Sequence, residues 1–465
     1  MKRVLLVMVC FILLVSFGCQ SKPETVVVST PAPTLSPTPA PTPVPTPSPA
    51  PVPTPTPEPE PMRVTVMAAG DLLCLSAQLS AARSGKTYGF DYCFEEVKNT
   101  ISSADLAIGN LETLIADGYQ YTASYSDNTP PSATPGGESP APSEGPAEEV
   151  PDTGDPDTGE DDADSGADTS VIDTLITRLS SAAEVPALEN EAPAASSSGN
   201  PKINAPESFL TAVLGCGFDV LTNANNHICD YRADGIVKTL QKLDEHNVPH
   251  TGAYVAPEDK KPLIADVKGI KIAVLAYTDI LNNSPGSGNA FMVDRYDEDR
   301  VAADIAAAKE AGTDFVIVSI HWGTEHTHKP NRGQRKIAEF VANAGADIIL
   351  GSHPHCTQPF ETVETERGPV PVLYSMGNFI SSMGKTMHKD GVIVCMTLEK
   401  TADTHVTTLS SLTYIPTLCA NSDKGRFVVF PADLASIANS PIADDLQDSR
   451  ERTIEVLTEN VAIAQ

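Results

Sequence analysis

Short apolar runs alternate with helical patterns over residues 63–115 and 203–379, and this alternation constrains the fold more than any other feature of the sequence. Runs such as RVTVMAAGD (63–71) and DFVIVSIHWG (314–323) are typical of buried strands. The segments between the runs repeat apolar residues at the spacing of amphipathic helices. Strands that alternate with helices favour an α/β architecture with largely buried strands.

The pattern gives a definite order of elements. The expected strands are 63–71, 105–112, 218–227, 271–279, 314–323, 346–355 and 371–379. The expected helices are 90–104, 205–217, 234–247, 299–311 and 333–344. A more β-rich tail, 391–400 and 405–416, precedes a C-terminal helix at about 441–458, within a C-terminal segment 441–465.

The first residues, MKRVLLVMVCFILLVSFGCQSK, have a basic start, an apolar stretch and a small residue before a cysteine, which indicates a signal peptide over 1–19. The stretch around Cys19 resembles the bacterial lipoprotein signal, although Ser16 and Phe17 depart from it. We expect acylation of Cys19; an uncleaved N-terminal anchor is the alternative. Either one places the folded part outside the cytoplasmic membrane, anchored to its outer face.

Composition removes two segments from any core. The 40 prolines are concentrated, and one cluster makes residues 20–62 a Pro-rich linker of extended polyproline II type. Residues 117–200 combine acidic residues with Pro, Gly, Ser and Thr, which predicts a disordered insertion in a domain spanning 63–440, with one short helix at 171–182. The formal net charge of −30 argues against nucleic acid as a partner, because phosphates would be repelled.

Polar side chains follow the apolar runs at the points where strands end. They are Asp71, Asn110, Glu112, Asn223 to His227, His321, His353 and His355. In open α/β sheets the carboxyl ends of strands form the crevice where ligands bind, so these groups could converge. Carboxylate, amide and imidazole groups together are suitable ligands for divalent ions such as Mn, Fe, Zn or Mg, of which one or two would be bound.

Each motif alone has an ordinary structural explanation. In GSHPH, extended backbone would put His353 and His355 on the same side, but both could be loop residues satisfied by backbone. His321 could be a buried, hydrogen-bonded histidine beside the core residue Trp322. The recurrence of such groups at successive strand ends is what favours a site.

The ordered motifs GDLL (70–73), GNLET (109–113), NANNHICDY (223–231), HWGTEHTHKP (321–330), GADIILGSHPHCTQPFE (345–361) and YSMGNF (374–379) resemble the CapA family of poly-γ-glutamate capsule biosynthesis proteins. That family is similar to calcineurin-like metallophosphoesterases. The resemblance implies an α/β fold of the metallophosphatase type, an αββα sandwich with two facing β-sheets flanked by helices.

The resemblance also implies a two-metal site. Asp71 and His355 would bind one metal, Glu112 would bridge, and Asn226, His321 and His353 would bind the second metal, while His227 would protonate the leaving group. The residues expected beside the substrate or behind the ligands are Asn110, Asn223, Asp230, Arg232, Glu325 and Asn378. Of these, Asn223, like Asn225, is expected to tie the loop backbone, Asp230 to orient the loop, and Arg232 either to face solvent, which we favour, or to meet an anionic substrate.

Two departures bear on activity. Leu73 stands where the superfamily has a histidine ligand, and Glu112 replaces a bridging aspartate, so weaker occupancy of the first metal position or a single metal is a hypothesis.

The expected function is a metal-dependent hydrolase for a capsular or cell-envelope polymer, with poly-γ-glutamate and capsule synthesis or export proteins as partners. The alternative is a non-catalytic, metal-dependent component that binds or exports poly-γ-glutamate.

Overall fold

The computed structural model describes residues 60–122, 201–422, 425–457 and 462–463. The predicted signal peptide, nearly all of the predicted linker, and the predicted helix at 171–182 lie outside these residues. The predicted insertion starts at residue 117, yet the described chain continues to Thr122, whose buried hydroxyl donates to the carbonyl oxygen of Cys74 at 2.9 Å. No helix in the described ranges is both long and apolar enough to cross a membrane.

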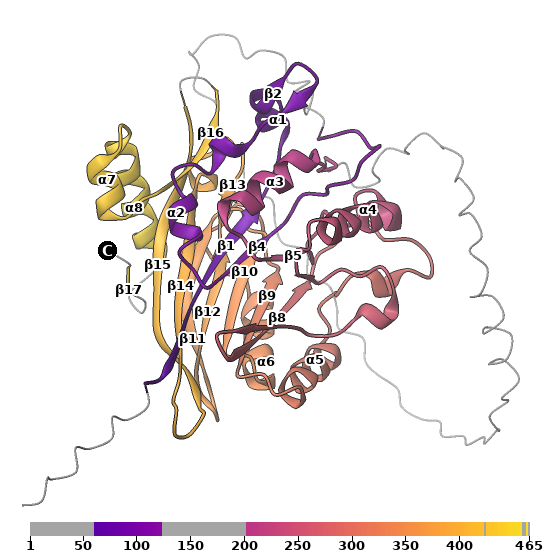
Figure 1. The fold of residues 1–465 in the computed structure, drawn as a ribbon, viewed down its shortest axis with the longest axis vertical. Helices are drawn as coiled ribbons and strands as arrows, with labels where there is room; N and C mark the ends of the chain where they lie inside the picture. Colours follow the sequence, from indigo (N-terminus) through magenta and orange to yellow (C-terminus); the bar gives the residue numbers. More distant parts are fainter. Residues whose placement is uncertain (1–59, 123–200, 423–424, 458–461, 464–465) are drawn as a thin grey trace, which may run out of the picture. The chain divides into compact units, whose positions relative to one another are not determined.

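The first of two large sheets has nine strands in the order β16-β15-β14-β1-β4-β5-β6, with β13 beside β1 and β17 beside β15 (Figure 1). Its strands are β1 (Met62–Leu72), β4 (Leu106–Asn110), β5 (Val220–Thr222), β6 (His250–Thr251), β13 (Asn378–Ile380), β14 (Asp390–Lys400), β15 (Thr407–Asn421), β16 (Phe427–Pro431) and β17 (Ala462–Ile463). The strands β1, β4, β5 and β6 run parallel to one another.

The second sheet has six strands in the order β11-β12-β10-β9-β8-β7. They are β7 (Leu263–Val267), β8 (Ile270–Thr278), β9 (Phe315–His321), β10 (Ile348–Ser352), β11 (Thr357–Thr365) and β12 (Gly368–Met376). The four central strands are parallel, and the edge strands β7 and β11 are antiparallel to their neighbours. A two-stranded ribbon, β2 (Arg83–Ser84) with β3 (Thr87–Tyr88), stands apart.

Helices surround the two sheets in the described chain. They are α1 (Ser76–Ala82), α2 (Lys98–Ile101), α3 (Glu207–Cys216), α4 (Arg232–Glu245), α5 (Glu298–Glu310), α6 (Arg332–Ala344), α7 (Leu434–Asn439) and α8 (Ala443–Leu457). Figure 1 shows α5 and α6 side by side against the second sheet, and α8 against β15. The predicted C-terminal helix thus corresponds to α8.

The alternation of side chains along the strands builds three apolar layers. On β8, Ile272 and Val274 join residues of the first sheet in the core between the sheets. The intervening Ala273 and Leu275 pack instead with residues of α5 and α6. A third core lies between the first sheet and the helices α1, α3 and α4. This order of layers confirms the predicted αββα sandwich.

The predicted helix at 90–104 is wrong as a continuous element. Its apolar spacing is helical, and Phe90, Phe94, Val97 and Ile101 are all buried. The backbone nevertheless forms only a 3₁₀ turn and the single turn α2, and neither has a side-chain cap. Without caps, packing under the sheet decides the backbone conformation over local propensity. The predicted strand 218–227 is likewise short, since only Val220–Thr222 pair.

Candidate metal centre

The polar residues predicted at strand ends meet at one edge of the two sheets. Asn110, at the end of β4, donates to Asp71 Oδ1 at 2.8 Å, and its amide nitrogen lies 3.4 Å from His321 Nδ1 at the end of β9. Because β4 belongs to the first sheet and β9 to the second, this contact joins the carboxyl ends of both. Asp71, Glu112, Asn226, His321, His353 and His355 are all buried.

Glu112 is the unsatisfied group at the centre. Its carboxylate is fully buried, and neither oxygen has a hydrogen-bond partner among the described residues. Oε1 lies 3.5 Å from His321 Nε2 and 3.9 Å from His355 Nε2. A buried carboxylate without donors is costly unless it is neutralised or meets a cation. Asp71 Oδ2 is buried as well, and His355 Nδ1 lies 3.2 Å from it.

Two groups of three side chains have the spacing of metal ligands. Asp71, Glu112 and His321 form one, and Glu112, His353 and His355 form the other; within each, the ligand atoms lie within 4.8 Å of one another. Glu112 is common to both, as a bridging carboxylate would be. The donor set and the unpartnered oxygens fit a divalent ion, or two ions that share Glu112.

The individual contacts also include the pairs that the family resemblance implied. His355 Nδ1 lies 3.2 Å from Asp71 Oδ2, and His353 Nδ1 lies 3.1 Å from His321 Nε2. His321 Nε2 is also 3.0 Å from Asn226 Oδ1. Three imidazole nitrogens and two acceptor oxygens therefore meet in these contacts, an arrangement that a cation stabilises.

Partners outside the ligand set orient the rings. His321 Nδ1 lies 3.1 Å from Ser352 Oγ, and His355 Nδ1 lies 3.0 Å from Asn378 Oδ1. Since Asn378 Oδ1 can only accept, the proton of His355 lies on Nδ1, and its ring presents the lone pair of Nε2 toward Glu112. Such outer partners fix the tautomer of metal-binding histidines. This places the predicted residue Asn378 behind a ligand.

The sequence predicted an extended backbone for the segment His353–Pro354–His355, and this prediction is wrong. His353 has φ 95° and His355 has φ 56°, both in the left-handed region. The rings still approach each other, with centroids 5.9 Å apart. Positive φ at residues other than glycine costs about 1–3 kcal/mol each and clusters at functional sites. The backbone turn, rather than strand alternation, brings the two imidazoles together.

Burial and mutual charge set the protonation of the ligand residues. Burial, followed by the charge of Asp71, raises the pKa of Glu112 well above its ordinary value. Burial and then the neighbouring His355 lower the pKa of His353 to about 3, and burial and then His353 lower the pKa of His321. Burial also acts to lower the pKa of His355, but the hydrogen bond and charge of Asp71 outweigh it and raise that pKa.

His227 is buried beside Asn226 and is held by a carboxylate. Its Nδ1 lies 2.7 Å from Asp230 Oδ2. Asp230 is fixed in turn, because Ile203 N donates to Oδ2 at 2.8 Å and Asn283 Nδ2 donates to Oδ1 at 3.1 Å. Asp230 therefore does more than orient its loop, since it engages Nδ1 of His227 and leaves Nε2 facing Asn282.

Asn223 and Asn225 were both predicted to tie the backbone of this loop, but only one of them does. Asn225 ties the backbone as expected: its amide donates to Leu111 O at 2.9 Å, and its Oδ1 accepts from His227 N at 3.1 Å. Asn223 does not, because both polar atoms of its side chain are buried without a hydrogen-bond partner among the described residues. Arg232 is exposed, in line with the favoured reading that it faces solvent.

Sequence reasoning missed several residues that contact the centre. Glu325, which was predicted, is exposed and lies 3.2 Å from the imidazole of His326, which was not. Asn282 Nδ2 lies 3.5 Å from His227 Nε2. The other missed residues are Asn283, Ser352 and His388. Only two of the missed residues lay next to predicted site residues in the sequence. Ser352 directly precedes His353, and His326 begins the HTH run (326–328) shortly after HWG (321–323).

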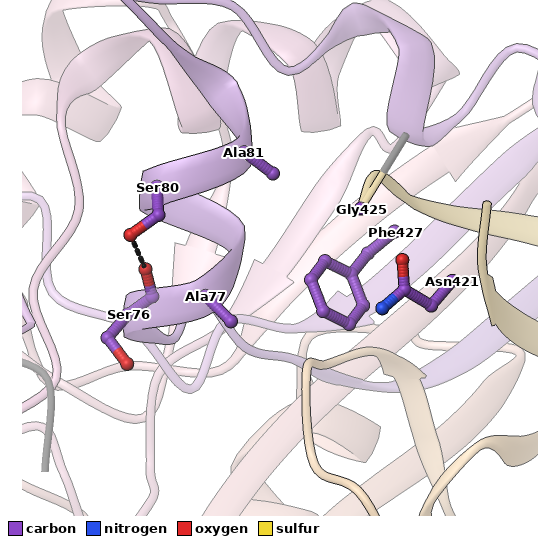
Figure 2. A pocket seen from close by; sticks show the side chains of 7 residues that line it. All are labelled: Ser76, Ala77, Ser80, Ala81, Asn421, Gly425 and Phe427. Atoms are coloured by element: carbon purple, nitrogen blue, oxygen red, sulfur yellow. Dashed lines mark hydrogen bonds between the residues drawn. The ribbon is translucent and has the colours of Figure 1, made fainter. Parts of the chain in front are cut away.

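The open hollow in Figure 2 is a different feature. It measures about 530 Å³ and lies between α1 and the strands β15 and β16. The described residues that line it are Ser76, Ala77, Ser80, Ala81, Asn421, Gly425 and Phe427. None of them has a titratable side chain, whereas the buried cluster is built from such side chains.

The chain has relatives with names that concern capsule synthesis. It is 33% identical over 237 residues to the PGA biosynthesis protein CapA of Bacillus subtilis, covering 49% of this chain and 54% of that protein. It is 34% identical over 206 residues to the capsule biosynthesis protein CapA of Bacillus anthracis, covering 42% and 48%. The chain thus spans about half the length of these relatives.

A solved phosphatase from Mycoplasma pneumoniae is similar with a TM-score of 0.36 and 10% identity, over 77% of this chain and 94% of that one. The family described as bacterial capsule synthesis protein PGA_cap matches residues 65–136 and 175–383, which together make up more than half of the sequence. The chain belongs to the bacterial capsule synthesis protein PGA_cap family.

Proposed function

We propose that the protein is a metal-dependent hydrolase, of the phosphoesterase type, that acts in the synthesis of a capsular or cell-envelope polymer such as poly-γ-glutamate. The observation that carries the proposal is the pairing of two metal-ligand groups that share Glu112 with a buried, carboxylate-held imidazole, His227. A scaffold that only bound metal would have no need of the second part.

The residues divide the work between holding ions and moving a proton. Asp71, Glu112, Asn226, His321, His353 and His355 would hold one or two divalent ions. An ion bound there supplies Lewis-acid polarisation of a phosphoryl oxygen. The buried side chains around it keep the ligand atoms in place.

His227 is suited to act as general acid. Asp230 accepts from Nδ1, which stabilises the imidazolium and directs Nε2 away from the loop. A proton carried on Nε2 can pass to a leaving oxygen, a role worth about 10²–10⁴-fold in rate.

A second candidate is a metal-dependent component that binds or exports poly-γ-glutamate without turnover. Leu73 favours it, since this buried apolar side chain stands where the resemblance expects a ligand. Both candidates concern the same site, and turnover distinguishes them.

The test is hydrolysis of p-nitrophenyl phosphate with added Mn²⁺ by the wild type, His227→Ala and, as a matched control, His405→Ala, an exposed histidine in the β14–β15 turn. Loss of turnover in His227→Ala alone, with metal retained, supports the hydrolase. Absence of turnover in all three, with metal-dependent binding of poly-γ-glutamate intact, supports the binding component instead.

We also propose that the protein is anchored to the outer face of the cytoplasmic membrane through a lipid on Cys19, beside capsule synthesis or export proteins. The support is the signal-like N-terminal sequence. Wild-type protein should partition into the detergent phase of a Triton X-114 extract, and Cys19→Ala should not. Equal partitioning of both would favour an uncleaved anchor.

A further inference from the structure

Two more histidines continue the imidazoles of the metal centre. The ring of His326 lies with its centroid 6.2 Å from that of His355, and the ring of His388 lies 4.6 Å beyond His326. Neither residue belongs to the two ligand groups. We call His326 and His388 the flanking pair.

Backbone hydrogen bonds hold the flanking pair against the ligand segment. His326 N donates to Pro354 O at 2.9 Å, and His326 itself has φ 62°. His388 O accepts from Asn378 Nδ2 at 2.9 Å, and the same amide donates to His355 O at 3.3 Å. The pair is therefore a fixed part of the site and not a chance surface contact.

The two members differ in burial. His388 is only 4% exposed, and its Nε2 is buried without a hydrogen-bond partner among the described residues. His326 is exposed, as is Lys385, which immediately precedes the 3₁₀ turn Thr386–His388. The cluster thus reaches from solvent to a ligand of the metal centre. An unpaired buried nitrogen is costly, which indicates that a ligand supplies its partner.

We propose that His326, Lys385 and His388 form a subsite for an anionic group, a carboxylate or a phosphate, of a polymer whose neighbouring unit enters the metal centre. This inference rests on the proposed function. Imidazole N–H and ammonium groups are hydrogen-bond donors suited to such an anion. Binding of an anionic group one unit away would fix which unit of the polymer lies at the metal centre.

Two neighbouring features bear on the choice of ligand. Glu325 Oε2 lies 3.2 Å from His326 Nε2, but this ion pair is exposed and weak in water, so a polymer carboxylate can compete with it. No described side chain competes for His388 Nε2. The flanking pair also lacks a third ligand close enough to complete a metal group in the described chain, which favours an anion over a further cation.

The experiment measures polymer binding to the full-length, metal-loaded protein by fluorescence anisotropy, with labelled poly-γ-glutamate and labelled polyphosphate as separate probes. His388→Leu and Lys385→Ala should each weaken binding of one probe, by about tenfold for the loss of one charged or buried contact. His388→Gln, which keeps an amide donor, should recover part of the loss. The control Lys336→Ala, an exposed lysine on α6, should bind as the wild type does.

The outcomes separate the possibilities. Weakening for poly-γ-glutamate identifies a carboxylate subsite, and weakening for polyphosphate identifies a phosphate subsite. Unchanged affinity of Lys385→Ala and His388→Leu for both probes overturns the inference, as does loss of a metal equivalent in His388→Leu. Lys385 is exposed, so its variant tests the subsite even if His388→Leu folds poorly.

Turnover of p-nitrophenyl phosphate by the wild type is recorded alongside. If turnover is absent but polymer affinity still depends on His388, the subsite stands and the hydrolase fails. If turnover is present and substitutions at the subsite leave polymer affinity unchanged, the hydrolase proposal stands and the subsite proposal alone is wrong.

Discussion

Glu112 Oε1 lies 3.5 Å from His321 Nε2, in a position where neither carboxylate oxygen of Glu112 has a hydrogen-bond partner among the described residues. The carboxylate comes from the loop after β4 in the first sheet, and the imidazole comes from the end of β9 in the second. The facing sheets thus bring together buried polar groups that do not satisfy each other's hydrogen-bonding capacity. A cation between them would serve both sheets.

The first prediction is that divalent metal stabilises the protein and that this depends on Glu112. Mn²⁺ in excess should raise the thermal unfolding midpoint of the wild type, because a ligand that binds only the folded state adds to its stability. Glu112→Gln keeps the shape but removes the charge, so Mn²⁺ should leave its midpoint nearly unchanged. An equal metal-induced shift in the two proteins would contradict a bridging role for Glu112.

The second prediction concerns pH in the metal-free protein. The folded pKa of Glu112 is raised, so the folded state holds this proton more tightly than the unfolded state does. Its stabilising contribution is present below the ordinary glutamate pKa and is lost as pH rises toward the raised value. In EDTA, Glu112→Gln should therefore gain stability relative to the wild type between about pH 5 and about pH 8. Urea unfolding of both proteins at several pH values checks this, and parallel pH profiles would refute it.

The order of the strands along the chain and the polar residues at their ends could be predicted from the sequence. Apolar runs of strand length located β1, β4, β8, β9 and β10, and the polar residues after them are the ones that meet. What connects the two sheets is not local. The approach of Asn110 to His321 joins strands of two separate sheets, and only the family resemblance implied that there would be two facing sheets.

The supporting residues were beyond sequence reasoning for a related reason. Asn283 reaches Asp230 from the loop after β8, and His388 reaches the centre from a turn before β14. Neither lies in a periodic pattern. The positive φ of His353 was equally invisible, because the bend depends on contacts that hold it.

The third prediction tests the close packing beneath the centre at Gly351, near the end of β10. A Cβ there would lie 2.0 Å from Tyr374 O and 2.5 Å from Trp322 Nε1, and the first of these is backbone that cannot move aside cheaply. Gly351→Ala should lower the free energy of unfolding by about 1–3 kcal/mol or more. It should also weaken metal binding, since His353 follows two residues later.

The matched control is Gly215→Ala in α3, where an added Cβ meets nothing within 4 Å. Replacing a helical glycine with alanine should raise the free energy of unfolding by about 0.5–1 kcal/mol. Denaturant titration of both variants measures the difference. A Gly351→Ala protein as stable as the wild type would show that β10 and β12 are not packed as described.

The last prediction separates the proton-moving residues from the metal ligands. Asp230→Asn keeps the size of the side chain but removes the charge that holds His227 Nδ1, so His227 loses both its orientation and the stabilisation of its imidazolium. Turnover of p-nitrophenyl phosphate should fall by about 100-fold at saturating substrate, with KM changed far less. Metal content should remain that of the wild type, because Asp230 is absent from both ligand groups. If Asp230→Asn instead lost its metal, or if its kcat matched that of the wild type, the role of His227 as the general acid would be wrong.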